Sequence, residues 1–181
     1  GPRQEANFCS AIHISDGCDE DGMAWVACGE AGEVQVTTDH GDSWQGLAEL
    51  GAPVWGLAGT PGGEQLFIAT HQGLFLSTDG GAPELVDFAG KNVWDVGVSP
   101  TWSQGQELFV LVPEDGWYRS TDGGQSFELL AAPTSDPSMT VALSPRYAED
   151  HAVAIGGFDG TWYSDDGGDS WEYAHALELI T

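Results

Sequence analysis

Positive charge is the scarcest feature of this sequence, which has 181 residues but only 4 lysines and arginines. Against 29 aspartates and glutamates, this gives a formal net charge of −25. Such an excess of negative charge repels nucleic-acid phosphates and anionic lipid surfaces. We therefore expect no nucleic-acid partner.

Long apolar runs are also missing. No stretch of about 18 apolar residues is present to span a membrane, and the start of the sequence shows no apolar signal segment. We therefore expect no membrane insertion. Gly1 and Pro2 are typical of the scar of a cleaved tag, so residues 1–6 are interpreted as tag scar and leader. A signal segment trimmed with that leader would suit an extracellular or cell-surface protein, which is the location we expect.

Cysteine is rare, and the three cysteines all fall in the first thirty residues. An odd number excludes complete pairing within the chain. Cys9 and Cys28 are expected on neighbouring strands of one hairpin, so a disulfide between them is one alternative. We prefer the alternative that they are buried thiols, because free cysteine packs as a small apolar side chain.

The sequence contains one short motif that is repeated four times. A hydroxyl residue, an aspartate and a glycine recur, and the four aspartates are spaced at a nearly constant interval typical of a repeat architecture. The copies are residues 37–44, 77–81, 120–127 and 164–171. The aspartate can accept hydrogen bonds from nearby backbone amides and the glycine tolerates a positive φ, so each copy predicts a tight turn. We expect the aromatic residue after the turn to point inward as an anchor.

Three copies follow the pattern Ser/Thr-x-Asp-x-Gly-x-Ser/Thr-Trp/Phe, and the second departs from it at Ala82, Pro83 and Glu84. The chain thereby resembles the Asp-box or BNR-repeat β-propellers, which include sialidases and sortilin-type receptors. The motif residues, to which we assign a structural role, are Asp39, Gly41, Trp44, Asp79, Gly81, Asp122, Gly124, Phe127, Asp166, Gly168 and Trp171. The resemblance implies an all-β propeller that takes its ligands on the face opposite these turns.

A second marker, a Ser or Thr that usually precedes Pro, recurs in register with the first and divides each repeat into four short strands. The expected blades are residues 7–50, 51–90, 91–133 and 134–181. No strand is left over to close a ring. The chain could therefore be a self-contained ring of four blades, half of a homodimeric ring, or part of a larger ring, and we favour the last two because an open arc would expose apolar blade faces.

Candidate ligand-binding residues come from the loops expected on the face away from the motif turns. They are Trp55, Trp94, Asp95, Lys91, Asn92, His71, Glu114, Asp115 and Asp159. Trp55 and Trp94 each stand five residues before the second marker, so they occupy equivalent positions. Two indoles among carboxylates could stack on sugars or hold a cation, or they could serve only as packing.

Three functions remain open. We favour a non-catalytic module that binds a protein or a glycan, without a cofactor, a metal or catalytic residues. The alternatives are a fragment similar to a glycoside hydrolase, with a carboxylate pair drawn from Asp95, Glu114, Asp115 and Asp159, and a purely structural half-propeller that self-associates. Sialidase activity is disfavoured, because that family binds its substrate with three arginines and only Arg119 and Arg146 follow the leader. The acidic loop 16–22 lacks the ligand spacing of an EF-hand, so we expect a solvated turn rather than a calcium site.

Overall fold

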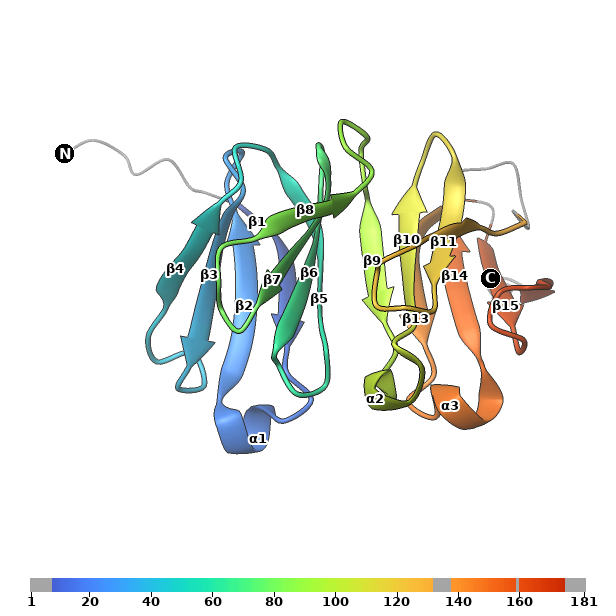
Figure 1. Ribbon diagram of the computed structural model, residues 1–181, viewed down its shortest axis with the longest axis horizontal. Helices are drawn as coiled ribbons and strands as arrows, with labels where there is room; N and C mark the ends of the chain where they lie inside the picture. The colour runs from blue at the N-terminus through green and yellow to red at the C-terminus, as the bar shows by residue number, and fades with distance from the viewer. Residues whose placement is uncertain (1–7, 132–137, 159, 175–181) are drawn as a thin grey trace, which may run out of the picture. The chain divides into compact units, whose positions relative to one another are not determined.

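The computed structural model describes residues 8–131, 138–158 and 160–174. The chain divides into two compact units, residues 1–90 and 91–181. Each unit contains two four-stranded antiparallel sheets in which the strands follow one another in chain order (Figure 1). The all-β expectation and the division of each repeat into four strands are confirmed.

The first unit holds the first two blades. Blade 1 consists of β1 (Cys9–Ile14), β2 (Met23–Cys28), β3 (Glu33–Thr38) and β4 (Gln45–Glu49). Blade 2 consists of β5 (Val54–Gly59), β6 (Gln65–Thr70), β7 (Gly73–Thr78) and β8 (Glu84–Asp87). Its core lies between the two sheets, where Trp25 and Val34 of blade 1 pack in one cluster with Leu57 and Ile68 of blade 2.

The second unit holds the other two blades. Blade 3 consists of β9 (Asp95–Val98), β10 (Leu108–Val112), β11 (Gly116–Ser120) and β12 (Glu128–Leu129). Blade 4 consists of β13 (Ser138–Leu143), β14 (Val153–Gly157), β15 (Gly160–Ser164) and β16 (Glu172–Ala174). Its core is again built between the sheets, from Phe109 and Trp117 of blade 3 with Tyr147 and Ile155 of blade 4.

The second strand of a blade is the most buried one. In β6, every residue from Leu66 to Thr70 is buried, and all five residues of β10 are buried. Unbroken apolar runs are typical of strands covered on both faces. In each unit the partner blade packs on one of these faces.

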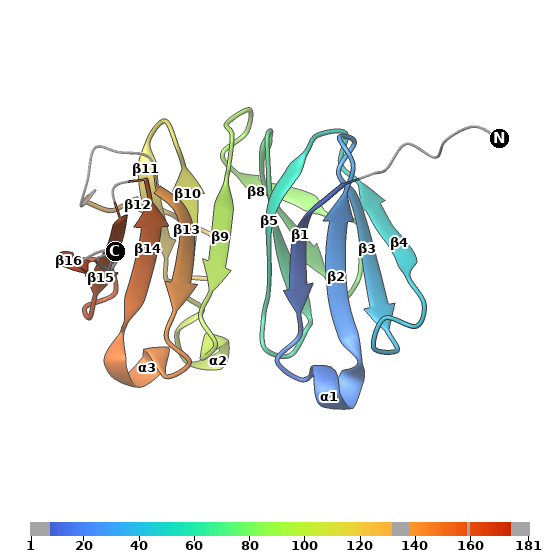
Figure 2. The ribbon, with the colours of Figure 1, turned by 180° about the vertical axis from the view of Figure 1, so that it is seen from behind.

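Three single-turn helices that the sequence did not predict lie between the first and second strands of blades 1, 3 and 4. They are α1 (Cys18–Asp21), α2 (Trp102–Gly105) and α3 (Tyr147–Asp150). In each unit they lie at the end of the sheets where these connections run (Figure 2). Four residues are too few to show a helical periodicity, so nothing in the pattern indicated them.

Candidate ligand-binding site

Three of the four motif turns are closed by the same set of hydrogen bonds. In the first, the Asp39 carboxylate accepts bonds from the Thr37 hydroxyl at 2.7 Å, the Ser43 amide at 2.8 Å and the Ser43 hydroxyl at 2.5 Å. The Thr37 hydroxyl oxygen in turn accepts the Gly41 amide at 3.0 Å. The turns at Asp122 and Asp166 repeat these contacts with their own serines and glycines.

These bonds change the acidity of the aspartates. The Ser43 hydroxyl and amide, together with Thr37, lower the pKa of Asp39 to about 2. Equivalent bonds led by Ser170 lower the pKa of Asp166 to about 2, and the pKa of Asp122 is also lowered, chiefly by Ser126. Donors that point at the ionised carboxylate favour that form. The turns thus depend on charged aspartates, which suits a role in holding the chain rather than in transferring protons.

The second copy forms a different turn. Asp79 has a positive φ of 51°, and the Ser77 hydroxyl donates to the Gly81 carbonyl at 2.7 Å instead of bonding the aspartate. The position that would supply the second hydroxyl is Pro83, which has none. The sequence divergence after Gly81 therefore removes the hydrogen bonds centred on the aspartate carboxylate, and the bond from Ser77 to Gly81 closes the turn instead.

The expectation that each motif aromatic is a buried anchor is wrong for Trp44. In blade 4, Trp171 packs against the core of the second unit, where it lies beside Phe109 and Leu130 of blade 3. Trp44, the equivalent residue of blade 1, is 39% exposed. Trp171 thus packs on the preceding blade of its own unit, and within the first unit no blade precedes blade 1.

A pocket of about 320 Å³ lies at the opposite end of the first unit, away from the motif turns. Its aromatic walls are Phe8 and Trp55, whose side chains are 62% and 39% exposed. Its lining is completed by Ser10, Gly29, Glu30, Pro53 and Val54. Exposed aromatic rings around a concavity are typical of binding sites, because the rings offer large apolar contact at low entropic cost.

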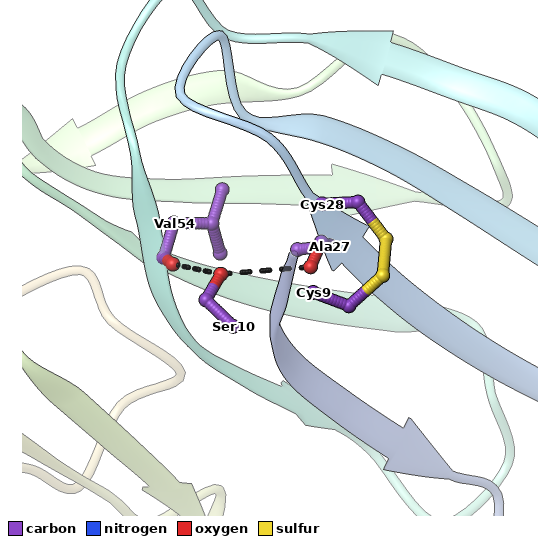
Figure 3. The surroundings of a disulfide bond; sticks show 5 residues. All are labelled: Cys9, Ser10, Ala27, Cys28 and Val54. Carbon is purple, nitrogen blue, oxygen red and sulfur yellow. Dashed lines mark hydrogen bonds between the residues drawn. A yellow bond between two sulfur atoms is a disulfide. The ribbon is translucent and has the colours of Figure 1, made fainter. Parts of the chain in front are cut away.

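A disulfide between Cys9 and Cys28 fixes one wall of this pocket (Figure 3). The preference for buried free thiols was therefore wrong. The two cysteines are direct partners in the pairing of β1 with β2. The pocket residues Phe8 and Ser10 flank Cys9, so the bridge holds both of them to the neighbouring strand.

A hydrogen bond joins the two sides of the pocket. The Ser10 hydroxyl donates to the Val54 carbonyl at 2.6 Å and also faces the Ala27 carbonyl at 3.5 Å (Figure 3). Val54 precedes Trp55, which stands at an irregularity in the pairing of β5 with β6. This irregularity takes Trp55 out of the regular ladder, so its indole belongs to the pocket rather than to the core.

Trp94, the equivalent residue of blade 3, has a different environment. It is partly buried and packs against the hydrophobic core of the second unit. Its amide donates to the Leu111 carbonyl at 2.9 Å, which continues the ladder between β9 and β10. Among the two predicted tryptophans, Trp55 therefore has the exposure that a binding site needs.

Two of the predicted polar residues meet in the second unit. The Lys91 ammonium forms an ion pair with the Asp115 carboxylate, which also accepts the Tyr118 hydroxyl at 3.0 Å. The Lys91 bond, followed by that of Tyr118, lowers the pKa of Asp115. The pair joins the connection before blade 3 to the tip of the β10–β11 hairpin.

Asp95 is a structural residue. One carboxylate oxygen accepts the amide of Val141 in β13 at 2.9 Å, and the other accepts its own neighbour Val96 at 2.9 Å. Burial raises the pKa of Asp95, although bonds from Val141, Thr140 and Val96 oppose that effect. This carboxylate therefore links the innermost strands of blades 3 and 4.

The remaining predicted residues are scattered. His71 is exposed beside the pocket of the first unit, where its amide donates to the Pro53 carbonyl at 3.0 Å. In the second unit, Asn92 is half-buried and Glu114 is exposed. Asp159 lies outside the described residues. Phe8 and Glu30 were not predicted as site residues; Phe8 is adjacent to Cys9, and Glu30 lies two residues after Cys28, so the disulfide is the signal that would have indicated them.

The acidic loop of blade 1 is exposed at Asp16 and at residues 19–21. It contains α1, and the Asp21 carboxylate accepts the Ser15 hydroxyl at 2.8 Å and the Met23 amide at 2.7 Å. Within the described ranges, no group of three or more His, Cys, Asp or Glu residues is arranged to hold a metal ion. None of the helices in those ranges is long and apolar enough to cross a membrane.

Comparison with solved structures identifies the architecture. The chain resembles an ancestral GH74 enzyme with a TM-score of 0.75 at 19% identity, covering 94% of this chain and 24% of that one. It resembles YCF48 bound to D1 peptide with a TM-score of 0.68 at 19% identity, covering 100% and 57%. The four sheets are blades of a β-propeller.

A third similar structure, from a nidogen/laminin complex, has a TM-score of 0.76 at 12% identity and covers 95% of this chain and 66% of that one. The propeller chain therefore spans at most about two thirds of these three neighbours. No protein-family model matches the sequence. No curated protein matches it either. At these identities the likeness establishes the fold alone.

Proposed function

We propose that this propeller is a non-catalytic module that binds a protein through the pocket around Trp55. The observation that carries the proposal is a half-exposed indole in a pocket whose walls are tied together by a disulfide and a hydrogen bond. A preorganised site loses less entropy on binding than one that must be ordered by its ligand. The volume of about 320 Å³ suits one or two apolar side chains of a partner.

A protein is preferred to a glycan for two reasons. Two of the similar propellers are described with a peptide or a protein partner, YCF48 with the D1 peptide and nidogen with laminin. In addition, the pocket walls are mainly apolar, and Glu30 and Ser10 are the polar side chains among its lining residues. Sugar sites need more hydrogen-bonding groups than this lining offers. The carboxylates proposed for hydrolysis do not support that alternative, because Asp95 and Asp115 are engaged in structural bonds.

We also propose that the turns belong to Asp-box repeats and that a further copy or further blades complete the ring. The hydrogen bonds shared by Asp39, Asp122 and Asp166 support the first point. The exposure of Trp44 supports the second, since its counterpart Trp171 is covered by the preceding blade. The disulfide supports an extracellular or cell-surface location, because such bonds persist in oxidising compartments.

The test is to pan a library of displayed random peptides against the chain and to screen immobilised glycans in parallel. We expect enrichment of peptides with a shared apolar residue, and no retention of glycans. The Trp55→Ala variant should lose at least about tenfold in affinity for an enriched peptide, since truncating an aromatic hot spot at a pocket centre costs about 2 kcal/mol or more. Retention of glycans alone, or peptide binding that is indifferent to Trp55→Ala, would contradict the proposal.

A further inference from the structure

A second cavity lies in the first unit, at the end that carries the motif turns. It has a volume of about 390 Å³ and lies between the sheets of blades 1 and 2. Blade 1 contributes Met23, Trp25, Val36 and Leu47, and blade 2 contributes Glu64 and Asp79 at the acidic side. This groove is separate from the Trp55 pocket, with which it shares no lining residue.

The second unit shows what the same groove looks like when it is filled. There, the Tyr147 ring is buried edge-on against Phe109 with ring centroids 6.2 Å apart, and its hydroxyl donates to Glu107 at 2.6 Å. Trp171 packs into the same cluster beside Leu130. Two aromatic side chains of blade 4 thus occupy the space that faces blade 3.

The register of the strands makes the two grooves equivalent position by position. Trp25 pairs with Val36 in blade 1 as Phe109 pairs with Arg119 in blade 3. Leu47 follows its motif aspartate at the same distance in sequence as Leu130 does. The floor of the empty groove is therefore the counterpart of the floor that Tyr147 and Trp171 cover.

The sequence of blade 2 explains why its groove is empty. The amide of Gly63 bonds the Thr60 carbonyl as the amide of Tyr147 bonds the Ser144 carbonyl, so glycine stands where blade 4 has tyrosine. A Cβ atom at Gly63 would lie 3.0 Å from the Met23 sulfur, so this position faces the groove. Glu84, in turn, stands five residues after its motif aspartate, where blade 4 has Trp171. Both filling rings are missing from blade 2.

The charge of the groove differs as well. In the second unit, Arg119 lies at the groove, where its guanidinium donates to the Gly167 carbonyl at 2.9 Å and forms an ion pair with Asp169 at 3.0 Å. Its counterpart in the first unit is Val36. Residues 8–90 contain no lysine or arginine, while Glu64 and Asp79 line the groove. The empty groove thus lacks two aromatic rings and one cation that the filled one contains.

We propose that the groove binds a peptide segment of a partner that carries a tryptophan or tyrosine next to an arginine or lysine. The ring would lie on Trp25, Val36 and Leu47 as Trp171 and Tyr147 lie on their counterparts. The cation would meet the carboxylates of Glu64 and Asp79. The surplus of negative charge on the chain favours such a ligand over a neutral or acidic one.

The probe is a capped Gly/Ser peptide with Arg-Trp-Arg at its centre, titrated into the full chain by calorimetry at physiological salt. Two matched peptides replace the tryptophan with alanine or both arginines with glutamates. We expect saturable binding of the first peptide. The affinity of each of the other two peptides should be at least about tenfold lower, which corresponds to about 1.4 kcal/mol. Equal binding of the alanine peptide would overturn the proposal, because charge alone would then explain the interaction.

Two variants test the location. Pro83→Ser combined with Glu84→Trp restores the residues that blade 4 has, and is expected to raise the melting temperature and to weaken peptide binding at least about tenfold, since a ring of the chain itself then fills the groove. Val36→Arg places an arginine where the second unit has Arg119. It should weaken binding of the cationic peptide without changing the packing of the turn. Undiminished binding to both variants would overturn the proposal.

Matched controls accompany these variants. Glu172→Trp adds the same residue to the corresponding outer strand of blade 4, and Gln35→Arg adds the same charge to β3 next to Val36. Both should bind the Arg-Trp-Arg peptide as the unaltered chain does, and equal losses in variants and controls would overturn the assignment to this groove. Trp55→Ala should also leave this binding unchanged, so failure here and failure of the Trp55 site are distinguishable.

Discussion

The hydroxyl of Ser10 donates a hydrogen bond of 2.6 Å to the carbonyl of Val54, and this bond joins β1 of the first blade to β5 of the second. Ser10 follows Cys9, whose disulfide holds it to β2, and Val54 precedes Trp55. The covalent bridge, the hydrogen bond and the indole therefore form one continuous support for the pocket.

Removing the disulfide should destabilise the first unit and loosen the pocket. The bridge closes a segment with a sequence separation of 19 residues, and a loop of this length corresponds to about 3 kcal/mol of stabilisation. In urea unfolding, the double variant Cys9→Ser with Cys28→Ser should lose about that much free energy of unfolding. Its peptide affinity at the Trp55 pocket should also fall more than that of the control variant Cys18→Ser. Equal stability of the double variant and of Cys18→Ser would contradict this role of the disulfide.

The motif turns should give a pH dependence with a defined sign. The folded-state pKa of Asp39 and of Asp166 is about 2, below the ordinary value for a carboxyl group, so their contribution is present above about pH 4 and is lost as the pH falls through 2. Asp166→Asn should therefore lower the melting temperature at pH 6, and the difference from the unaltered chain should shrink towards pH 2.

Asp79 is the matched control for this experiment. It occupies the same motif position, but its turn is closed by Ser77 and Gly81 instead of by the carboxylate. Asp79→Asn should change the melting temperature little at either pH. A loss equal to that of Asp166→Asn would show that the hydrogen-bond network is not the source of the effect.

Asp95 should behave as a structural residue of the second unit. Asp95→Ala leaves the part-buried Val141 amide without its acceptor, so the free energy of unfolding should fall by about 1–3 kcal/mol. Glu114→Ala, an exposed carboxylate expected on the same face, should change stability by less than about 0.5 kcal/mol. A stable Asp95→Ala protein that has lost ligand binding would instead indicate a direct role in recognition.

Trp44 should matter for assembly and not for the ligand. If a second copy completes the ring as proposed, light scattering of the unaltered chain at increasing concentration should show a mass above 19.1 kDa, because Trp44 is exposed and available for that contact. Trp44→Ala should shift the mass towards the monomer while binding at the Trp55 pocket persists. A monomer at every concentration would contradict completion of the ring by self-association.

Much of the fold could be predicted from the sequence, because the motif turns and the second marker recur at a nearly constant interval. The motif turns and the second marker predicted four strands in each repeat, and each sheet has four. In blades 1, 3 and 4 the outer strand begins only after the motif serine, because that serine belongs to the turn. The short helices were missed because four residues carry no periodic signal.

The site was less predictable than the fold. Trp55 and Trp94 are equivalent in sequence, yet one lines a pocket and the other packs on a core. The irregularity in the pairing of β5 with β6 takes Trp55 out of the ladder, and Phe8 and Glu30 line the pocket beside it. Similarly, the groove is empty because Gly63 and Glu84 stand where blade 4 has Tyr147 and Trp171. This effect becomes visible only when the structures of blades 2 and 4 are compared.

The most direct test of the central claim is to record the tryptophan indole resonances of the isotope-labelled chain while an enriched peptide is added. We predict that the Trp55 indole shifts progressively to saturation, that the Trp44 indole does not, and that Trp55→Ala abolishes the saturable response. Shifts confined to Trp44 and the motif turns, with Trp55 unmoved at saturation, would contradict the assignment of the binding site.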